Sequence, residues 1–376
     1  MRIGTLPVGD PIHRYEKCIV VPFSGRRRVL STCALNGGYQ EGLTAVFNND
    51  INPGAGMECR MRAPSYEAHL ALTAEALGLD PSTAAGMSTA ASMENVAIRT
   101  EQSGVTAVTA VVTGGIEVNG GRVGDPASWD EAVEQGTPSA AGTINIMLFF
   151  NVDLTPGALA RALVTCTEAK TAALQELLAP SRYSMGLATG SGTDGTIVVC
   201  NRESEACLTN AGKHSKLGEL IGKAVKPAVQ EALRRQTGLS PELQHHVLRR
   251  IDRFGVTEQS LWEAYAQGPG RLSRAEFSEK LDSLCRQSCL VTQVSLYVHL
   301  LDQLQWGLLA PGEALRAGRG ILEGLREIPE GGSQSLLPGN TEDAEPGAAP
   351  EVLSRMLREL EEALNRLLEE REAGSR

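Results

Sequence analysis

The sequence contains no apolar run long enough to cross a membrane. No stretch approaches the ~18 consecutive apolar residues of a membrane helix, and the apolar run nearest the N-terminus, Cys18 to Phe23, is too short for a signal peptide. The eight cysteines form no C-x-x-C pair, and most lie in apolar runs, where a free thiol packs as a small hydrophobic group. We therefore expect a cytoplasmic protein with no membrane span and no disulfide framework.

An excess of positive charge is also absent. With 35 Lys and Arg against 45 Asp and Glu, the net charge is -10, which argues against non-specific nucleic-acid binding. Half of that excess lies in residues 341–376, where ten acidic residues stand against five arginines. The motifs G-x-x-x-x-G-K-[ST], H-E-x-x-H and G-x-S-x-G are missing too, so the sequence has no recognised phosphate loop, zinc-protease helix or serine-hydrolase elbow.

The 376 residues are enough for two domains, and the pattern of apolar residues changes near Thr237. Before that point, strand-like runs alternate with helical periodicity, and the polar break at 101–104 favours an antiparallel hairpin. The expected strands are 18–23, 28–34, 96–100, 105–113, 143–152 and 196–201, and the expected helices are 66–77, 156–178 and 215–235. We predict an α+β fold for residues 1–235, with a mixed, largely antiparallel sheet packed with helices.

From residue 236 onward strand signals almost vanish, and short amphipathic helices predict an all-α accessory domain over 236–328. Residues 329–350 are rich in Gly, Pro, Ser and acidic residues and are expected to form a disordered linker. In the final helix, 351–372, five leucines recur at spacings of 4, 3, 4 and 3: Leu353, Leu357, Leu360, Leu364 and Leu367. Such a short seam is unstable alone, so we expect it to dock on a partner or on its own copy, and a frayed surface helix is the alternative.

The loop from Gly186 to Gly195 is the segment most indicative of function. It holds four glycines and three hydroxyl residues, and glycine lets backbone N–H groups approach a ligand closely. The run Gly212-Lys213-His214-Ser215 follows it and precedes a helical pattern, whose first N–H groups point outward. This pattern favours the rim of an active site, and a tight hairpin followed by a helix cap is the other interpretation.

The helix expected after Asp153 carries one charged residue on its apolar face. Thr155 is a plausible N-cap, and Pro156 fits the first helical position. At about 100° per residue, Lys170 projects into the leucine-rich stripe that faces the core, whereas Glu168 lies on the opposite, solvated face. A lysine in that stripe must snorkel, pair with an anion or lose its proton.

Three other polar segments are less decisive. Ser31 to Gly38 ends a strand in polar residues and glycines, which is a usual position for a ligand-binding loop. Gly86 to Met93 suits a buried turn as well as a substrate contact, and Asn145 would be a buried amide that needs hydrogen-bond partners. Asn48 to Asn52 lacks the ligand spacing of an EF-hand, and we expect a turn there.

Six segments occur in a characteristic order: STCALNGG (31–38), GMSTAASM (86–93), GTINI (142–146), TEAKTAALQEL (167–177), SRYSMGLATGSGTDG (181–195) and GKHSKLGELIG (212–222). Together they make residues 15–230 resemble the adenosylcobinamide amidohydrolase family of corrinoid salvage. Ser191 stands where many relatives are expected to have threonine. The region after residue 237 resembles nothing associated with that family.

The resemblance implies hydrolysis of the amide that joins the corrin propionyl side chain to aminopropanol, giving adenosylcobyric acid. Such a reaction needs an activated nucleophile, donors for the oxyanion and an acid for the departing amine. The catalytic candidates are His214, as the leading acid–base group, Lys170, Asp194, Glu219 and Ser215. The substrate-binding candidates are Thr32, Asn36, Gly37, Gly38, Thr89, Thr143, Asn145, Ser184, Thr189, Gly190, Gly192 and Thr193.

Several alternatives remain open at this level. The nucleophile could be water, a Ser or Thr hydroxyl, or water on a divalent metal held by His214, Asp194 and Glu219, although their spacing is not diagnostic. No cofactor is firmly implied. A corrinoid-binding or carrier protein without turnover, and an amidase of similar fold acting on another substrate, are the competing functions.

Overall fold

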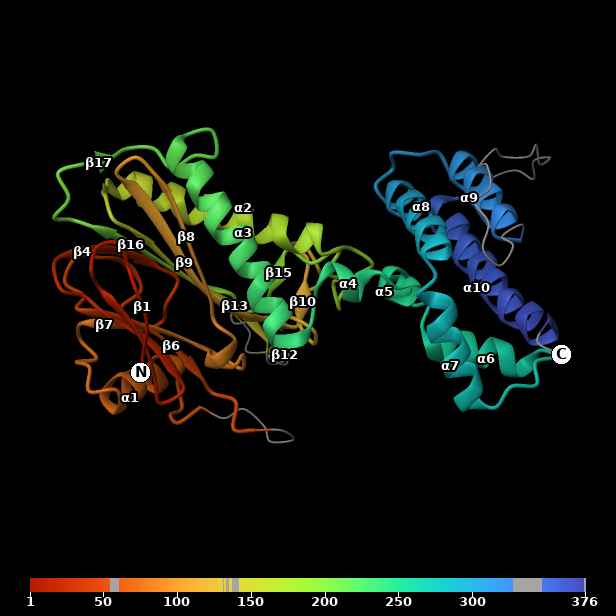
Figure 1. Cartoon of the computed structure of the whole chain (residues 1–376), viewed down its shortest axis with the longest axis horizontal. Helices are drawn as coiled ribbons and strands as arrows, with labels where there is room; N and C mark the ends of the chain where they lie inside the picture. Colours follow the sequence, from red (N-terminus) through yellow and green to blue (C-terminus); the bar gives the residue numbers. More distant parts are fainter. Residues whose placement is uncertain (55–60, 131, 133–134, 137–141, 327–346, 375–376) are drawn as a thin grey trace. The chain divides into compact units, whose positions relative to one another are not determined.

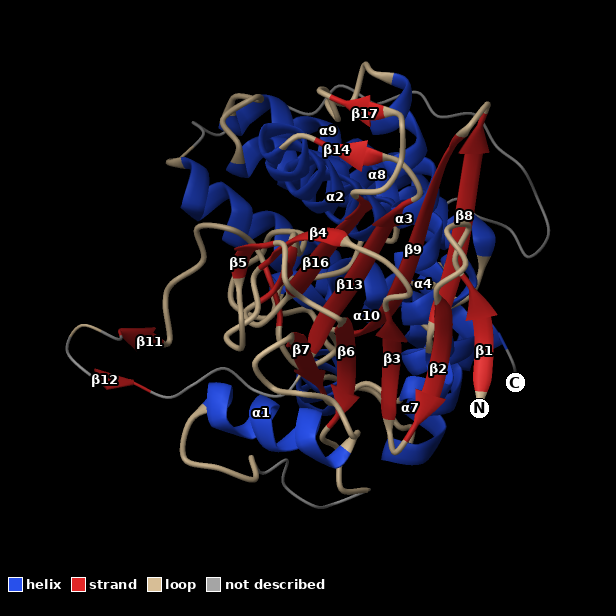
Figure 2. Ribbon diagram, turned by 90° about the vertical axis from the view of Figure 1, so that its left-hand side faces the viewer, coloured by secondary structure: helices blue, strands red, loops and turns tan. Residues whose placement is uncertain are grey.

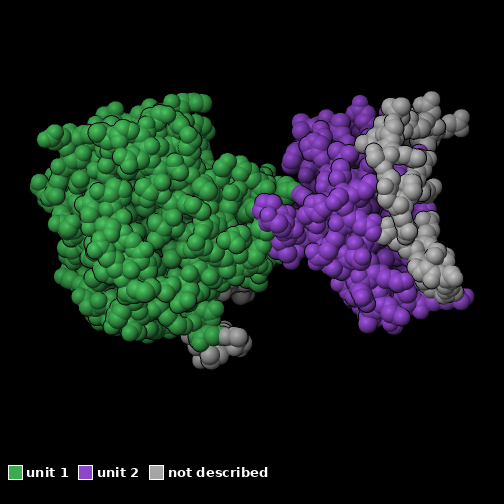
Figure 3. Space-filling model, in the orientation of Figure 1, with its two compact units in different colours: residues 1–240 green, residues 241–376 purple. Residues whose placement is uncertain are grey.

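The chain folds into two compact units. The computed structural model describes residues 1–54, 61–130, 132, 135–136, 142–326 and 347–374. Unit 1 comprises Met1–Ser240 and unit 2 comprises Pro241–Arg376 (Figure 3). The division therefore falls close to the change in sequence pattern at Thr237. Among the described helices none is both long and apolar enough to span a membrane.

Unit 1 contains a five-stranded sheet in the order β1-β2-β3-β6-β7. Its strands are β1 (Arg2–Thr5), β2 (Pro11–Tyr15), β3 (Cys18–Pro22), β6 (Ala45–Asp50) and β7 (Ala84–Thr89). Strands β6 and β7 are parallel and the other neighbours are antiparallel. Helix α1 (Tyr66–Ala76) connects the two parallel strands (Figure 2), and its Leu70 and Ala74 pack on the face that carries Phe47.

The second sheet has six strands in the order β5-β4-β16-β13-β9-β8. Its strands are β4 (Arg27–Ser31), β5 (Gly38–Gln40), β8 (Ala97–Ser103), β9 (Thr106–Gly115), β13 (Thr143–Phe150) and β16 (Gly195–Asn201). Only the β13–β16 pair is parallel, and helix α2 (Pro156–Glu176) lies between these strands in the sequence. Helices α2 and α3 (Lys216–Thr237) cover one face of this sheet (Figure 1). The predicted α+β fold with a mixed, largely antiparallel sheet is confirmed.

Side chains alternate between the two faces of each strand, and this alternation divides the core of unit 1 into layers. In β13, Ile146 and Leu148 pack toward α2 and α3, whereas Met147 and Phe149 pack toward the five-stranded sheet. Because successive side chains in a strand point to opposite faces, a strand that is covered on both sides becomes apolar throughout. Unit 1 is therefore a four-layer sandwich, with α1 outside one sheet and α2 with α3 outside the other.

Local sequence rules account for most of these elements. The hydroxyl of Thr155 caps α2 by accepting the N–H of Ala158 at 3.3 Å, and proline occupies the first turn, as predicted. The expected hairpin forms between β8 and β9, with Gly104 at φ +58° in its turn. Helix α3 ends at Gly238, whose left-handed φ of +77° suits a residue without a side chain.

The predicted turn at Asn48 to Asn52 is wrong, because Asn48 and Asn49 belong to the buried strand β6. Two adjacent asparagines are typical of a turn, but here their side-chain amides form hydrogen bonds inside the protein. Strand β7 was missed for a similar reason, since Ala-Ala-Gly-Met-Ser-Thr offers small residues rather than a β-branched run. The short strands β1 and β2 were also missed.

Unit 2 is helical in the residues that the structure describes. Its α-helices are α4 (Pro241–Gln244), α5 (Val247–Ile251), α6 (Glu258–Gln267), α7 (Arg274–Cys285), α8 (Ser288–Gln305), α9 (Pro311–Arg326) and α10 (Ala349–Gly374). Side chains from α5 to α10 share one hydrophobic core, centred on large residues such as Tyr265, Phe277 and Tyr297. The predicted all-α C-terminal region is thus confirmed.

The leucine seam is buried within unit 2. Leu360 and Leu364 are fully buried, Leu353 is almost so, and Leu357 and Leu367 pack against the same core, which they share with α6 to α9. The structure therefore does not support the expectation that this seam recruits a partner or a second copy, because its apolar surface is already covered. The predicted linker lies outside the described residues as far as residue 346.

Candidate functional site

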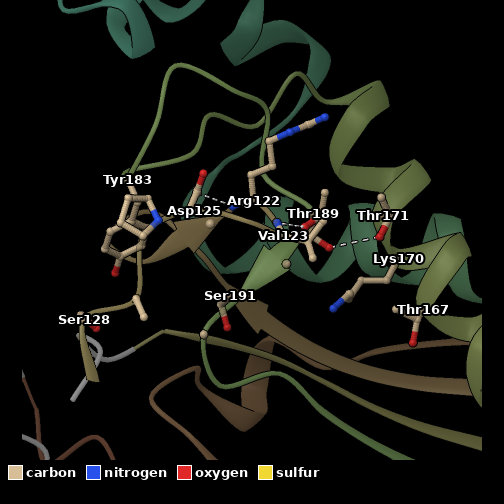
Figure 4. A pocket seen from close by; sticks show the side chains of 15 residues that line it. Arg122, Val123, Asp125, Ser128, Thr167, Lys170, Thr171, Tyr183, Thr189 and Ser191 are labelled. Atoms are coloured by element: carbon tan, nitrogen blue, oxygen red, sulfur yellow. Dashed lines mark hydrogen bonds between the residues drawn. The ribbon is translucent and has the colours of Figure 1, made fainter. Parts of the chain in front are cut away.

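A cavity of about 590 Å³ opens in unit 1 beside the middle of α2. Helix α2 supplies Thr167, Lys170 and Thr171, and the facing walls come from Tyr183 and residues 121–123, 125–128 and 189–192 (Figure 4). Two short strands, β10 (Gly120–Gly121) and β15 (Gly190–Ser191), pair with each other and hold these walls together. The glycine-rich loop therefore forms part of a cavity, and its assignment to the rim of an active site stays a prediction. The volume is in the range of small-molecule sites.

Lys170 is the buried cation of this cavity. Its side chain extends from α2 toward the β15 side (Figure 4), only 8% of the residue is exposed, and its ammonium pairs with the carboxylate of Asp194. Of the three alternatives for a lysine on an apolar stripe, the structure shows pairing with an anion. Glu168 is exposed and pairs with Lys213, which confirms its assignment to the solvated face.

Gly190 makes room for that ion pair. A Cβ atom at this position would lie 2.3 Å from Oδ2 of Asp194 and 2.7 Å from Nζ of Lys170. Such distances are far inside van der Waals contact, so any side chain would displace one partner. The glycine is required here because the two charged groups pass directly over the backbone.

Asp194 is fixed by three further donors. Its Oδ1 accepts the backbone N–H of Ile144 at 2.9 Å and the hydroxyl of Ser191 at 2.7 Å, and its Oδ2 accepts the backbone N–H of Ser191 at 3.1 Å. The carboxylate thus links the cavity loop to the start of strand β13. Both oxygens are engaged, so Lys170 meets a rigid anion rather than a freely rotating one.

Hydroxyl groups of the cavity wall, and of Thr193 and Thr143 outside its lining, hold the loop in place. Thr171 donates to the carbonyl of Thr189 at 3.1 Å, and the hydroxyl of Thr189 accepts the backbone N–H of Val123 at 2.9 Å. Thr193 donates to the carbonyl of Gly142 at 2.7 Å and pairs with the hydroxyl of Thr143. These contacts pre-organise the walls. The hydroxyl of Ser191, another wall residue, donates instead to the carboxylate that pairs with Lys170.

A buried polar layer lies between the two sheets behind Asp194. The amide of Asn145 donates to Oδ1 of Asn48 at 2.8 Å and to the carbonyl of Ser88 at 3.1 Å, and its Oδ1 accepts the N–H of Gly195 at 3.1 Å. Asn48 in turn donates to the hydroxyl of Thr113 at 2.8 Å. Asn145 is thus the buried, fully partnered amide that was expected, and it holds the backbone immediately after Asp194.

The polar layer ends at His69 on α1. The backbone N–H of Arg62 donates to its Nδ1 at 3.1 Å, so its Nε2 carries the proton that faces the hydroxyl of Ser88 at 3.3 Å. Burial, followed by the charge of Arg62, lowers the pKa of His69 and favours this neutral form.

Asp125 is a wall residue that the sequence reasoning missed. It accepts the hydroxyl of Ser181 at 2.6 Å and the backbone N–H of Arg122 at 2.7 Å. Burial acts to raise the pKa of Asp125, but hydrogen bonds from Ser181, Ser184 and the Arg122 N–H outweigh it and lower the pKa. Ser184, a predicted substrate contact, therefore supports Asp125, and its hydroxyl also accepts the N–H of Gly186 at 3.3 Å.

The His214 segment lies beside α2 but is not among the residues that line the cavity. His214 is exposed, Lys213 pairs with Glu168, and the carbonyl of Ala211 accepts the hydroxyl of Thr165 at 2.8 Å. These contacts place the segment along the part of α2 that precedes Lys170.

Two further catalytic candidates have other partners. Ser215 caps α3 by accepting the N–H of Gly218 at 3.1 Å. Glu219 lies on the surface of α3, where hydrogen bonds from Lys216 and then Lys223 lower its pKa to about 2. Neither side chain lines the cavity.

The loop after β4 and the end of β7 also lie apart from the cavity lining. The amide of Asn36, at φ +49°, donates to the carbonyls of Pro81 and Ala84, and a Cβ at Gly37 would lie 1.9 Å from the carbonyl oxygen of Cys33. The hydroxyl of Thr32 accepts the N–H of Thr196 at 3.0 Å, and that of Thr89 accepts the N–H of Ala91 at 3.0 Å. Gly38, at φ +74°, completes this turn. These residues stabilise loops in the structure, and any contact with a substrate stays a prediction.

Some missed wall residues were within reach of sequence reasoning. Thr167 stands three residues before Lys170 and four residues before Thr171, so helical periodicity places Thr167 beside both of them on α2. Residues 121–128 carry no comparable pattern. In the parts of the chain that the structure describes, no three His, Cys, Asp or Glu side chains gather as a metal site, and Asp194 and Glu219 both pair with lysines.

Comparison with known proteins assigns the family. Residues 4–241 match the family model described as adenosylcobinamide amidohydrolase, and the match ends where unit 1 ends. An uncharacterized protein of Methanocaldococcus jannaschii is 34% identical over 240 residues, which cover 60% of this chain and 89% of that protein. The match covers well over half of the chain, so the chain belongs to the adenosylcobinamide amidohydrolase family.

Proposed function

We propose that unit 1 hydrolyses the amide between the corrin propionyl side chain and aminopropanol of adenosylcobinamide. The products are adenosylcobyric acid and the free amino alcohol, which returns a salvaged corrinoid to coenzyme B12 synthesis. The observation that carries the proposal is the buried Lys170–Asp194 pair in the cavity of the unit that matches the family.

Lys170 is suited to stabilise the oxyanion that forms when a nucleophile attacks the amide carbonyl. An ammonium has three donors, and Asp194 accepts from one, which leaves the others for a ligand in the cavity. Because the pair is largely shielded from water, the positive charge of the ammonium acts more strongly on an oxyanion there than it would in solvent. Asp194 holds the ammonium in place before the substrate binds.

Two nucleophiles fit this arrangement. The hydroxyl of Ser191 lies at the wall and donates to Asp194, so it can pass its proton to that carboxylate and attack the carbonyl carbon; the C–N bond then breaks, the amine leaves with the proton, and water hydrolyses the acyl-enzyme. Alternatively a water held by Ser191 and Lys170 attacks directly. Ser191→Ala and Ser191→Thr separate these routes, because a covalent acyl-enzyme detected by mass spectrometry in the wild type, and absent from Ser191→Ala, requires the hydroxyl as nucleophile.

Incubation of the purified chain with adenosylcobinamide tests the proposal. We expect conversion to adenosylcobyric acid, followed by mass spectrometry, and its loss in Lys170→Met. Tight binding without conversion indicates a corrinoid carrier, and conversion of other amides alone indicates an amidase of different specificity. Either outcome refutes the proposed reaction.

A further inference from the structure

One wall of the unit 1 cavity is apolar and exposed to solvent. Its members, which we call the apolar wall, are Val123, Pro126, Ala127 and Tyr183, and all four line the cavity that holds Lys170. Val123 is 83% exposed and Tyr183 is 41% exposed, whereas only 11% of the Lys170 side chain is exposed. Tyr183 lies across the cavity from Lys170 (Figure 4). The cavity therefore has a shielded polar end and an open apolar side.

The apolar wall is held in place by the protein itself. The backbone N–H of Val123 donates to the hydroxyl of Thr189 at 2.9 Å, and the backbone N–H of Tyr183 donates to the hydroxyl of Ser181 at 3.1 Å. The ring of Tyr183 packs on Gly121, where a Cβ atom would lie 3.4 Å from Cδ2 of the ring. Exposed apolar side chains that are fixed at the mouth of a cavity are typical of a surface that contacts a ligand.

We propose that the apolar wall binds the corrin macrocycle, while the propionyl amide of the same substrate reaches Lys170 at the shielded end. This inference rests on the proposed function. In adenosylcobinamide two methylene groups join the ring to the amide carbonyl, and three C–C bonds of about 1.5 Å span at most ~4 Å. A carbonyl beside the Lys170 ammonium therefore brings the edge of the ring to the mouth of the cavity.

The size of the cavity keeps the ring at the mouth. A cavity of about 590 Å³ accepts a drug-sized molecule, and a complete corrinoid is much larger. The corrin ring system and its methyl groups are apolar, whereas its amide side chains project from the periphery. The ring can therefore bury apolar surface against Val123 and Tyr183 while the peripheral amides stay in water.

The adenosyl group is the competing occupant of the apolar wall. It is attached to the cobalt and not to the propionyl arm, so the position of the scissile amide does not bring it to this side of the cavity. The macrocycle carries the propionyl arm directly, and it is the apolar group that must follow the amide into the site. We therefore assign the wall to the macrocycle.

A contact with the macrocycle is the same before and during amide cleavage, so it should affect KM and leave kcat little changed. The test variants are Val123→Asn and Tyr183→Ala. The matched controls are Val105→Asn, at a valine that is 77% exposed in the β8–β9 turn, and Tyr15→Ala, at a tyrosine that is 54% exposed on β2. Neither control residue lines the cavity.

Steady-state kinetics with adenosylcobinamide and calorimetry with adenosylcobyric acid, which the chain does not turn over, are the two measurements. Each wall variant should raise KM and the dissociation constant about 10-fold, since burial of one such side chain is worth about one decade of affinity. Both controls should match the wild type. Because all four side chains are exposed, the melting curves should also be unchanged.

Cyanocobyric acid, which lacks the adenosyl group, distinguishes the macrocycle from the nucleoside. The wall variants should weaken its binding by the same factor as that of adenosylcobyric acid. A loss confined to the adenosyl form would place the nucleoside at the wall and overturn the proposal. Unchanged KM and dissociation constants in both wall variants would overturn it as well, and would leave the proposed function intact if the wild type hydrolyses adenosylcobinamide.

The failure of the proposed function gives a different result. A wild type that binds adenosylcobyric acid but does not hydrolyse adenosylcobinamide, with weaker binding in the wall variants, would refute the reaction and support the assignment of the wall. A wild type that binds neither corrinoid would overturn both.

Discussion

Replacing Lys170 by methionine should separate the chemical role of the ion pair from its structural role. Methionine keeps much of the lysine stem, so packing on α2 changes little, but Asp194 loses its counter-ion. Removing one partner of a fully buried ion pair costs about 3–5 kcal/mol. Here the lysine and aspartate side chains remain 11% and 12% exposed, and Asp194 keeps three other donors.

We therefore expect Lys170→Met to lower the free energy of unfolding of unit 1 by roughly 1–3 kcal/mol. For a unit of this size the midpoint of its thermal transition should fall by roughly 3–10 °C. Turnover of adenosylcobinamide should fall at least ~100-fold, or about 2.7 kcal/mol of barrier, because the oxyanion loses its cation.

The double variant Lys170→Met/Asp194→Asn distinguishes the two effects. Asparagine keeps an oxygen for the N–H of Ile144 and the hydroxyl of Ser191, loses the acceptor for the N–H of Ser191 and carries no charge, so part of the lost stability should return while activity stays low. The measurements are calorimetry of each variant and product formation by mass spectrometry. Near-normal turnover in Lys170→Met would remove the lysine from the mechanism, and a double variant less stable than Lys170→Met would refute the ion pair as the cause of the destabilisation.

Four further predictions concern unit 1. Gly190→Ala should lower turnover at least ~10-fold, because the new Cβ would lie 2.3 Å from the Asp194 carboxylate, whereas the control Gly222→Ala, at an open position on α3, should leave turnover unchanged. Equal activity of the two variants would show that the close approach of the ion pair to Gly190 is unimportant. His214→Ala should reduce turnover less than ~10-fold, because the imidazole is exposed and outside the cavity lining. A loss as large as that of Lys170→Met would instead assign His214 a catalytic role. A fragment of residues 1–240 should fold and retain the activity of the full chain, and a folded but inactive fragment would assign unit 2 a part in turnover. In that fragment the free energy of unfolding should fall as the pH drops below about 6.5, because the unfolded chain binds a proton at His69 at a higher pH than the folded chain does. Denaturation of His69→Gln at several pH values should show a weaker pH dependence, and an unchanged slope would exclude His69 as its source.

The sequence predicted elements best where one local rule acted alone. Helix α2 has a hydroxyl cap, a first-turn proline and a regular apolar stripe, and it forms where expected. The hairpin of β8 and β9 follows from a polar break between two β-branched runs. The prediction missed strand β6 because the hydrogen bonds of the Asn48 amide go to Asn145 and Thr113, which lie 97 and 65 residues away in the sequence. No local sequence pattern indicates such distant partners.

The candidate site shows the same division. Helical periodicity placed Lys170 on a buried face, yet its partner was left open, because Asp194 lies on a loop whose path depends on β13 and β15. Thr167 and Thr171 were not predicted, although the periodicity of α2 could have indicated them, whereas the wall at residues 121–128 has no regular spacing and could only be found in three dimensions. His214 and Glu219 were chosen as candidates because they are ionisable. In the structure His214 is exposed to solvent and Glu219 pairs with lysines, and both environments depend on the tertiary fold.

The buried amides explain why the ion pair can be rigid. Asn145 occupies a strand position where an apolar residue would pack more simply, and every hydrogen-bonding group of its side chain has a partner. Its oxygen fixes the N–H of Gly195, while the preceding residue, Ile144, fixes the carboxylate of Asp194. Asp194 is therefore held from both sides by one strand, β13, which is anchored across the sandwich to β6 and β7. The catalytic role that we propose for the Lys170 ammonium requires a counter-ion that cannot move, and the polar layer between the sheets provides that restraint.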